Sequence, residues 1–255
     1  TPAVSVTSTA RAITALAVFA SSVPVASTAS AVRAQRDPAG WLLYDVMALL
    51  FSAQRDSWLI SPYFVPGTDM KRAFAAARAR GVRVRILTNS LASNDAPLAH
   101  AGYARHRKAL LEMGIELHEM RSEAANVRSA LRAGTTGSSG GSAGASRAML
   151  HTKLLVIDGR LVAVGSMNLD MRSQLQNTEI AVLIASRRFS QLAGDSIDES
   201  LPENSWRVDL DPKGKLVWRA PLDSGLRDSY SEPDASLGLR LMLQLLGPLA
   251  PDSLL

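Results

Sequence analysis

Cysteine is absent from the sequence, and this absence excludes disulfide bonds and thiolate chemistry. Histidine is scarce as well. The four histidines do not have the spacing of zinc ligands, so we expect neither a zinc site nor any other cofactor. Aromatic residues make up 5% of the chain, and they form no stripe with basic residues of the kind that binds single-stranded nucleic acid. Nucleic acid is therefore not an expected partner.

A hydrophobic run of membrane-spanning length is also absent, because such a helix needs about 20 apolar residues. Any membrane contact should then be peripheral. Residues 1–37 are rich in small residues, with Arg11 ahead of a short apolar run at 13–20. This pattern is compatible with a signal-like export segment, with a disordered leader, and with the ragged end of a missing upstream lobe. We favour the third interpretation, and in each case we expect the segment to be poorly ordered.

What is present is a globular composition. The 255 residues are 47% hydrophobic, which is enough for a full core in one or two domains. The net charge of +5 comes with arginines that are spread along the chain. A mild positive excess suits phosphate-bearing partners, but it is equally typical of an ordinary solvated surface.

The first half of the sequence alternates between helix and strand patterns. Apolar residues at helical intervals predict helices at 41–54, 70–80 and 99–113, and β-branched runs predict strands at 57–61, 82–87 and 115–120. Such alternation is the signature of parallel crossover connections, so we expect an α/β sandwich.

The second half begins with residues 121–148, whose Gly/Ser-rich centre predicts a flexible loop. A linker between domains is one interpretation. We favour a mobile rim over a functional site, because the tract runs directly into the motif at 151–168, and we expect residues 38–255 to form one domain. Beyond the motif the patterns predict a strand at 179–185, a helix at 187–201, strands at 206–210 and 216–219, and a helix at 235–246.

The segment 151–168, HTKLLVIDGRLVAVGSMN, holds the clearest chemical signal. Two β-branched runs flank an Asp-Gly dipeptide, which favours a hairpin turn. His151 and Lys153 are two residues apart, so an extended chain places them on one face, and Ser166 and Asn168 form a second such pair. An imidazole, an ammonium, a hydroxyl and an amide at one end of a sheet would suit a phosphate group.

Taken one at a time, these residues have ordinary explanations. A histidine beside a strand is often packed or solvated, Lys153 can be a charge on the rim, Asp158 can be only the turn former, and Gly165 can mark a bulge. Together they favour a functional site, because burying several polar groups on one face of an otherwise apolar strand pair would cost free energy.

The whole segment resembles the HKD motif of the phospholipase D superfamily, with no departure in spacing or in key residue type. Four further segments are similar to the second half of bacterial cardiolipin synthases of the C type, namely 59–66, 83–92, 100–107 and 204–207. The resemblance runs from about residue 38 to the C-terminus. It implies a phospholipase D-like α/β/α sandwich with a mixed, largely parallel sheet, as one lobe of a normally two-lobed enzyme.

The resemblance implies phosphodiester transfer on phospholipids through a phosphohistidine, and this scheme needs no metal. Glu179 sits where the family carries the acid that steers the histidine. Lys153, Asn168 and Ser166 would donate hydrogen bonds to phosphoryl oxygens, where charge reorganises in the transition state. Asp158 would form the turn and position the lysine.

Substrate contacts are expected at His100, Tyr103 and Gly165. His100 matches the family's His-x-Gly-Tyr stretch, which could contact the glycerol or head group of a lipid. The alternative for His100 is a surface residue at a helix N-terminus. Tyr103 and Arg107 would lie on the same helix face as this histidine.

The sequence departs from the family in one respect. The family uses two HKD motifs, whose histidines share the roles of nucleophile and general acid/base, and this sequence contains one. We expect the second motif either from a missing upstream lobe, which we favour, or from a second chain in a symmetric dimer. The role of His151 stays open between nucleophile and acid/base.

The expected function is that of a phosphatidyltransferase of the cardiolipin synthase type, peripheral to the bacterial cytoplasmic membrane. Its substrates would be phospholipids of the phosphatidylglycerol, phosphatidylethanolamine or cardiolipin class. Two alternatives remain. One is a phospholipase, phosphodiesterase or homodimeric HKD nuclease with the same chemistry, and the other is an inactive half-domain that only binds a partner or a membrane.

Overall fold

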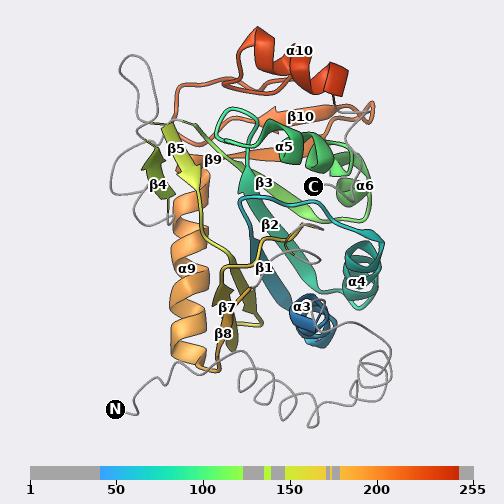
Figure 1. Cartoon of the computed structure of the whole chain (residues 1–255), viewed down its shortest axis with the longest axis vertical. Coiled ribbons are helices and arrows are strands. Elements are labelled where there is room, and N and C mark those ends of the chain that lie inside the picture. Colours follow the sequence, from blue (N-terminus) through green and yellow to red (C-terminus); the bar gives the residue numbers. More distant parts are fainter. Residues whose placement is uncertain (1–40, 123–134, 139–146, 171–172, 174–178, 247–255) are drawn as a thin grey trace.

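The structure, a computed structural model, describes residues 41–122, 135–138, 147–170, 173 and 179–246. Its centre is an eight-stranded sheet with the strand order β10-β9-β3-β2-β1-β6-β7-β8 (Figure 1). The strands are β1 (Asp56–Ile60), β2 (Arg83–Asn89), β3 (Glu116–Met120), β6 (Leu154–Ile157), β7 (Leu161–Gly165), β8 (Ala181–Ile184), β9 (Ser205–Leu210) and β10 (Leu216–Arg219). The expected strands are confirmed, whereas the expectation for residues 1–37 lies outside the described residues.

The sheet is mixed, as expected, but its parallel part is small. β1 pairs with β2, and β2 with β3, in parallel, through the crossovers that the alternation of helix and strand patterns predicted. The other five pairings are antiparallel. The expectation of a largely parallel sheet is therefore wrong for the described strands, because hairpins such as that from β6 to β7 reverse the chain, and because β6 and β9 return antiparallel to β1 and β3.

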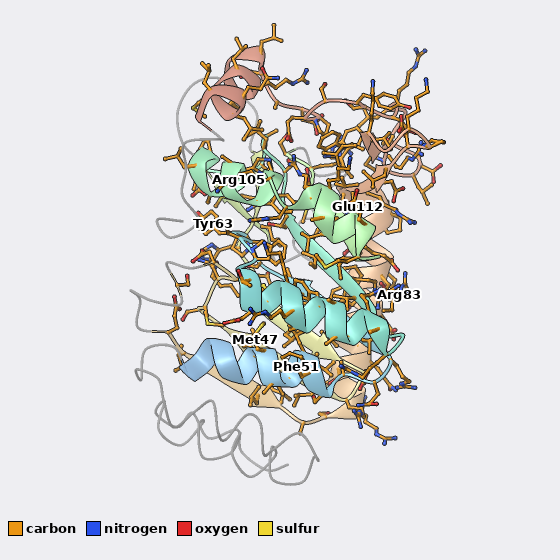
Figure 2. The ribbon with its side chains drawn as sticks, turned by 90° about the vertical axis from the view of Figure 1, so that its right-hand side faces the viewer. Met47, Phe51, Tyr63, Arg83, Arg105 and Glu112 are labelled. Carbon is orange, nitrogen blue, oxygen red and sulfur yellow. The ribbon has the colours of Figure 1, made fainter. Side chains whose placement is uncertain are left out.

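Helices cover both faces of the sheet, which gives the expected α/β/α sandwich (Figure 1). α3, α4, α5 and α6 lie on the face that Figure 2 shows, α9 lies on the opposite face, and α10 packs next to α5. The helices are α3 (Trp41–Ser52), α4 (Thr68–Ala79), α5 (Pro97–Ala104), α6 (Arg107–Glu112), α9 (Arg187–Asn204) and α10 (Leu237–Leu246).

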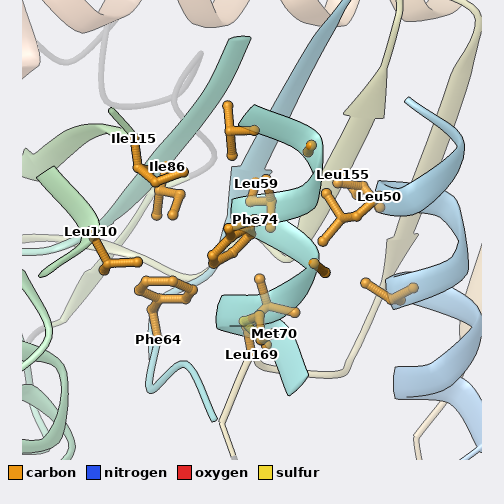
Figure 3. Close-up of a cluster of buried hydrophobic side chains, with 14 of the residues drawn as sticks. Leu50, Leu59, Phe64, Met70, Phe74, Ile86, Leu110, Ile115, Leu155 and Leu169 are labelled. Atoms are coloured by element: carbon orange, nitrogen blue, oxygen red, sulfur yellow. The ribbon is translucent and has the colours of Figure 1, made fainter. Parts of the chain in front are cut away.

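The central strand β1 joins the two helical layers. Leu59 belongs to the cluster under α3 and α4, together with Phe74 and Ile86 (Figure 3). Its chain neighbours Trp58 and Ile60 belong to the cluster under α9. Because successive side chains of a strand point to opposite faces, one continuous apolar run contributes to two cores.

The helix expected at 99–113 is divided in two. α5 ends at Ala104 and α6 begins at Arg107, and between them the N–H of His106 donates to the carbonyl of Tyr103 at 2.8 Å. Arg107 is buried and pairs with Glu119 of β3 at 2.8 Å. A buried guanidinium needs such a partner. The partner lies on a strand, so helical periodicity alone could not predict where the helix breaks.

The flexible loop expected at 121–148 is described only in part. Residues 123–134 and 139–146 lie outside the described residues. Within the tract, β4 (Thr135–Ser138) pairs antiparallel with β5 (Arg147–Leu150). Eight residues that the composition assigned to a loop or its edge are therefore strand, and β5 leads the chain directly to His151.

Candidate active site

The hairpin of β6 and β7 brings the polar residues of the motif to one end of the sheet. β6 lies between β1 and β7, and Leu154 is the register partner of Val164. The N–H of Gly165 donates to the carbonyl of Lys153 at 3.2 Å. His151 and Lys153 therefore enter the hairpin where Ser166 leaves it, as the alternation of polar and apolar residues predicted.

His151 and Lys153 form the open part of this site. The His151 side chain is exposed, so its imidazole is accessible to a ligand. The ammonium of Lys153 donates to the backbone carbonyl of His151 at 2.9 Å, which holds the lysine beside the histidine. Burial lowers the pKa of Lys153, and the carboxylates of Glu179, Asp170 and Asp95 oppose that shift.

Ser166 and Glu179 are joined by a direct hydrogen bond. The Ser166 hydroxyl donates to the Glu179 carboxylate, and the same hydroxyl accepts from the N–H of Ile180 at 3.1 Å. The N–H of Ser166 in turn donates to the carbonyl of Ile180 at 2.9 Å. The motif thus fixes the start of β8, so that the Glu179 carboxylate lies within electrostatic reach of Lys153.

Gly165 permits a close approach between β7 and β8. A Cβ atom at this position would lie 2.1 Å from the carbonyl oxygen of Ile180 and 2.9 Å from the Cα of Ala181. Both contacts are with backbone, which cannot move aside without breaking the strand pairing. The geometry gives Gly165 a structural role in the site, while contact with a substrate stays a proposal.

Asn168 offers an unused hydrogen-bonding group. Its Oδ1 atom is buried and has no hydrogen-bond partner among the described residues. The next residue is held firmly, since the N–H of Leu169 donates to Ser61 Oγ at 3.0 Å and its carbonyl accepts from the N–H of Val65 at 2.8 Å. Buried amides usually find partners, so this oxygen can accept a hydrogen bond from a ligand donor such as a hydroxyl.

A tyrosine three residues after β1 extends the polar surroundings of the site. Tyr63 donates from its hydroxyl to Asp95 Oδ1 at 2.5 Å. Burial and this bond raise the pKa of Tyr63, and the charge of Asp170 adds to the effect. Because Asp95 and Asp170 also act on Lys153, the loop after β2 and the segment after β7 meet around the same ammonium.

Asp158 lies at the other end of the hairpin. Its carboxylate accepts from the backbone N–H groups of Gln54, Arg55 and Asp56, and from the guanidinium of Arg160 at 2.8 Å. The length of β6 separates it from Lys153, which is five residues away or about 16 Å along a strand. The turn role is confirmed, whereas direct positioning of the lysine does not agree with these contacts.

His100 and Tyr103 are buried rather than open to a substrate. His100 is 1% exposed, its Nε2 accepts from Arg107 at 2.7 Å, and the ring of Tyr103 packs edge-on at 5.6 Å. Tyr103 is also 1% exposed and donates to Glu119 at 3.1 Å. The expected substrate contacts are therefore corrected: both side chains belong to a buried polar cluster, because the charge of Arg107 needs them there.

The same cluster includes a distant carboxylate. Glu232 pairs with Arg107, and this charge lowers the pKa of Glu232 to about 2, although burial alone would raise it. The indole of Trp218 donates to Glu119 at 2.9 Å. The cluster ties the C-terminal segment to β3 and α6, which makes it part of the scaffold.

Asn89 is a residue of the site that the sequence patterns did not single out. Its side chain is fully buried at the end of β2. Its Oδ1 accepts from the N–H of Leu150 at 2.9 Å, and its Nδ2 donates to the carbonyls of Leu150 at 3.2 Å and Pro62 at 3.3 Å. Leu150 immediately precedes His151, so the Asn89 amide holds the backbone that carries the histidine. The sequence offered little signal for it, because Arg83, Arg85 and Thr88 of the same strand are polar as well.

The described residues contain no cluster of three or more histidine, aspartate or glutamate side chains suited to a metal ion. The arrangement that remains is an exposed imidazole, an ammonium, a hydroxyl bonded to a carboxylate, and an unsatisfied amide. Fold and site together define a phospholipase D-like domain that carries one HKD motif.

Comparison with known proteins agrees with this class. The chain belongs to the family described as "Cardiolipin synthase, PLD-like domain", which it matches over residues 46–200. It is 37% identical to cardiolipin synthase C of Escherichia coli (strain K12) over 84% of this chain and 43% of that protein. It is 29% identical to a cardiolipin synthase of Geobacillus sp. (strain WCH70) over 60% of this chain and 25% of that protein.

A solved structure supports the fold. Phosphatidylserine synthase of Haemophilus influenzae Rd KW20 aligns with a TM-score of 0.55 at 15% identity, over 84% of this chain and 44% of that chain. The alignment shows a shared α/β architecture. The chain spans less than half the length of these relatives, since the covered shares are 43%, 25% and 44%.

Proposed function

We propose that this chain forms one lobe of a phosphatidyltransferase of the cardiolipin synthase type, which transfers a phosphodiester between phospholipids through a phosphohistidine intermediate. The observation that carries the proposal is the end of the β6–β7 hairpin. There an exposed imidazole stands beside a partly buried ammonium, and Asn168, three residues after β7, has a buried amide oxygen without a hydrogen-bond partner among the described residues. Membership of the cardiolipin synthase PLD-like family supports the same chemistry.

The transfer has two balanced steps. In the first, a histidine ring nitrogen attacks phosphorus, the bond from phosphorus to the head-group oxygen breaks, and a second histidine gives its proton to the departing alkoxide. In the second, that histidine takes the proton of an acceptor hydroxyl, whose oxygen attacks phosphorus and releases the first histidine. His151 supplies one of these two imidazoles.

The other site residues stabilise the charge on the phosphoryl group and orient the histidine. Burial of the Lys153 ammonium strengthens its attraction for non-bridging phosphoryl oxygens, because fewer water molecules compete with them. The Nδ2 group of Asn168 donates a hydrogen bond to the same oxygens, whereas the Ser166 hydroxyl, which donates to Glu179, holds that carboxylate in place. Glu179 accepts the second ring N–H of the histidine and so selects the tautomer with a free nitrogen facing phosphorus.

The second histidine requires another HKD motif. We propose that it comes from an upstream lobe, and the fraction of the relatives' length that this chain spans, 43% for the Escherichia coli protein, leaves room for one. A second copy of this chain is the alternative source. The substrate is a membrane phospholipid of the phosphatidylglycerol, phosphatidylethanolamine or cardiolipin class. The site therefore works at the surface of the cytoplasmic membrane, as a peripheral domain.

The test is an analysis of products. The chain, alone and joined to its upstream coding region, is incubated with vesicles of phosphatidylglycerol with and without phosphatidylethanolamine, and the lipids are identified by mass spectrometry. We expect cardiolipin and a free head-group alcohol. Phosphatidic acid as the main product would instead identify a hydrolase, and a folded protein with no turnover in either form would identify an inactive half-domain.

Two lysine variants provide the internal comparison. Lys153→Ala removes the ammonium from the site, and we expect the rate to fall by at least ~100-fold, a size typical for loss of one transition-state donor. Lys108→Ala removes an exposed lysine whose nearest acid, Glu112, is 3.9 Å away. The rate of the Lys108 variant should equal that of the parent protein. Equal rates for both variants would refute the assignment of the site.

A further inference from the structure

Helix α10 is apolar on two opposite faces. On its inner face, Leu239 and Leu243 pack against Leu91, Ala92 and Ala235, which form a small core of their own. This contact fixes α10 on the loop that follows β2. Leu239 and Leu243 thus hold the helix in place.

The outer face of α10 is a row of exposed leucines. Leu237, Leu241 and Leu245 are 76%, 58% and 71% exposed. Their spacing of four residues places them one above another on a single helix face. Single exposed leucines are ordinary on protein surfaces, but an aligned row on one helix forms a continuous apolar strip. We call these three residues the leucine strip.

The leucine strip belongs to the edge of the molecule that carries the site. α10 packs on α5 and on the loop that begins directly after β2 (Figure 1). That loop starts from Asn89, which holds the backbone next to His151. In Figure 2, α10 stands above Arg105, which directly follows α5, and Tyr63 lies below them. A surface bound to the strip would thus meet a helix that rests on the loop leading from Asn89.

The chemistry of α10 favours a lipid surface over a protein partner. Its ten residues include one charged residue, the cation Arg240, and no acid. Leucines on one side with a flanking arginine match an anionic bilayer, because the side chains enter the acyl region while the guanidinium meets phosphate groups.

We propose that the leucine strip of α10 docks this domain onto an anionic phospholipid bilayer and presents the site to the head-group layer. The proposal rests on the proposed function for the presence of a bilayer, and it adds the surface that makes the contact. The helix lies in the plane of the interface, as short amphipathic helices do.

Vesicle flotation tests the contact directly. The full chain is mixed with vesicles of phosphatidylglycerol and phosphatidylcholine, or of phosphatidylcholine alone, and centrifuged through a density gradient. We expect flotation with the anionic vesicles, and at least ~10-fold weaker binding for the double variant Leu237→Ser/Leu245→Ser. The matched control is Leu192→Ser/Leu222→Ser, whose leucines are 57% and 66% exposed elsewhere on the surface and whose variant should float like the parent chain.

Melting curves of both double variants should match the parent chain, because all four leucines are exposed. Unchanged flotation of the Leu237/Leu245 variant would overturn the proposal. Sedimentation that shows a dimer of the parent chain, converted to a monomer by the same variant, would also overturn it and make the strip an interface between copies.

A soluble substrate separates this proposal from the proposed function. With the upstream region present, the Leu237/Leu245 variant should keep its full rate on a short-chain phosphatidylglycerol below its micelle concentration, and lose at least ~10-fold on vesicles. Absence of turnover on both substrates in the parent protein would refute the proposed function, while flotation would still decide whether the strip binds lipid.

Discussion

Replacing Asp158 tests whether the aspartate of the HKD motif stabilises the fold or acts in the chemistry. Its side chain is 1% exposed, and its carboxylate accepts three backbone N–H groups at 2.8 to 3.2 Å as well as the guanidinium of Arg160. Asp158→Ala removes the acceptor and leaves these donors without a partner, which costs about 1–3 kcal/mol for each one that water does not reach.

The backbone adds to this cost. Asp158 has a φ of +52°, a left-handed conformation in which alanine is less stable than aspartate by about 1 kcal/mol. We expect Asp158→Ala to lower the free energy of unfolding by about 2–4 kcal/mol in total. Asp158→Asn keeps a carbonyl acceptor and tolerates the backbone, so its loss should be about 1–2 kcal/mol.

The effect should depend on pH. Burial alone would raise the pKa of Asp158, but the N–H groups of Asp56, Arg55 and Gln54 and the side chain of Arg160 outweigh it and lower the pKa. The folded carboxyl then has a lower pKa than the unfolded one, so its contribution is complete above about pH 4 and is lost as the pH falls through the folded value. The difference between the parent protein and Asp158→Asn should shrink below that pH.

Urea unfolding followed by circular dichroism at pH 7 measures the loss, with Asp223→Ala as the control. Asp223 has a φ of +54° and an exposed side chain, so its variant reports the backbone effect of about 1 kcal/mol alone. Under conditions where all proteins are folded, turnover by Asp158→Asn should stay within about threefold of the parent, a change below 1 kcal/mol. Unfolding energies equal to the control, together with a large loss of turnover, would refute this reasoning.

Three further predictions concern the scaffold of the site and the sheet that carries it. Gly165→Ala should lower the melting temperature and abolish turnover, because its Cβ would collide with backbone at 2.1 Å, whereas Gly194→Ala in α9, with nothing within 4 Å, should be neutral or stabilising. Burial lowers the pKa of His118 to about 4, so protonation of the unfolded chain should reduce stability between about pH 6.5 and 4 by about 1–3 kcal/mol, and His118→Gln should remove this slope in urea titrations. Asn89→Ala should lower kcat and leave KM nearly unchanged, because the backbone before His151 loses its hydrogen bonds to the Asn89 side chain. Steady-state kinetics measure both constants.

The site hairpin could be predicted because its signals are local. The Asp-Gly turn and the alternation of polar and apolar residues lie within 18 consecutive residues, 151–168. Because side chains alternate along a strand, this spacing places the polar side chains together at one end of the hairpin. Most strands and helices followed from periodicity for the same reason, whereas β4, β5 and the break between α5 and α6 did not.

What could not be predicted depends on contacts between distant parts of the chain. His100 was expected at the substrate, but its surroundings are set by Glu232, 132 residues further on, together with Arg107. Asn89 acts on Leu150 across 61 residues. A single sequence carries no signal that pairs such positions, since each has an ordinary local pattern of its own.

The parallel share of the sheet was overestimated for a related reason. Helix and strand patterns in the first half correctly predicted the parallel neighbours β1, β2 and β3. The insertion of β9 beside β3 and of β6 beside β1, both antiparallel, is decided by how the second half returns to the sheet. That return depends on tertiary packing, and hydrophobic periodicity does not predict which strand each segment pairs with or in which direction.

The central claim is that His151 takes part directly in phosphodiester transfer. The most direct measurement is the rate of cardiolipin formation from phosphatidylglycerol vesicles by the chain joined to its upstream region, with His151 intact and with His151→Ala, each checked for an unchanged circular dichroism spectrum. His151 is exposed, so its loss should leave the fold intact. The account predicts a rate at least ~10,000-fold lower for the variant, as for removal of a catalytic histidine. A folded His151→Ala protein that retains transfer activity would contradict it.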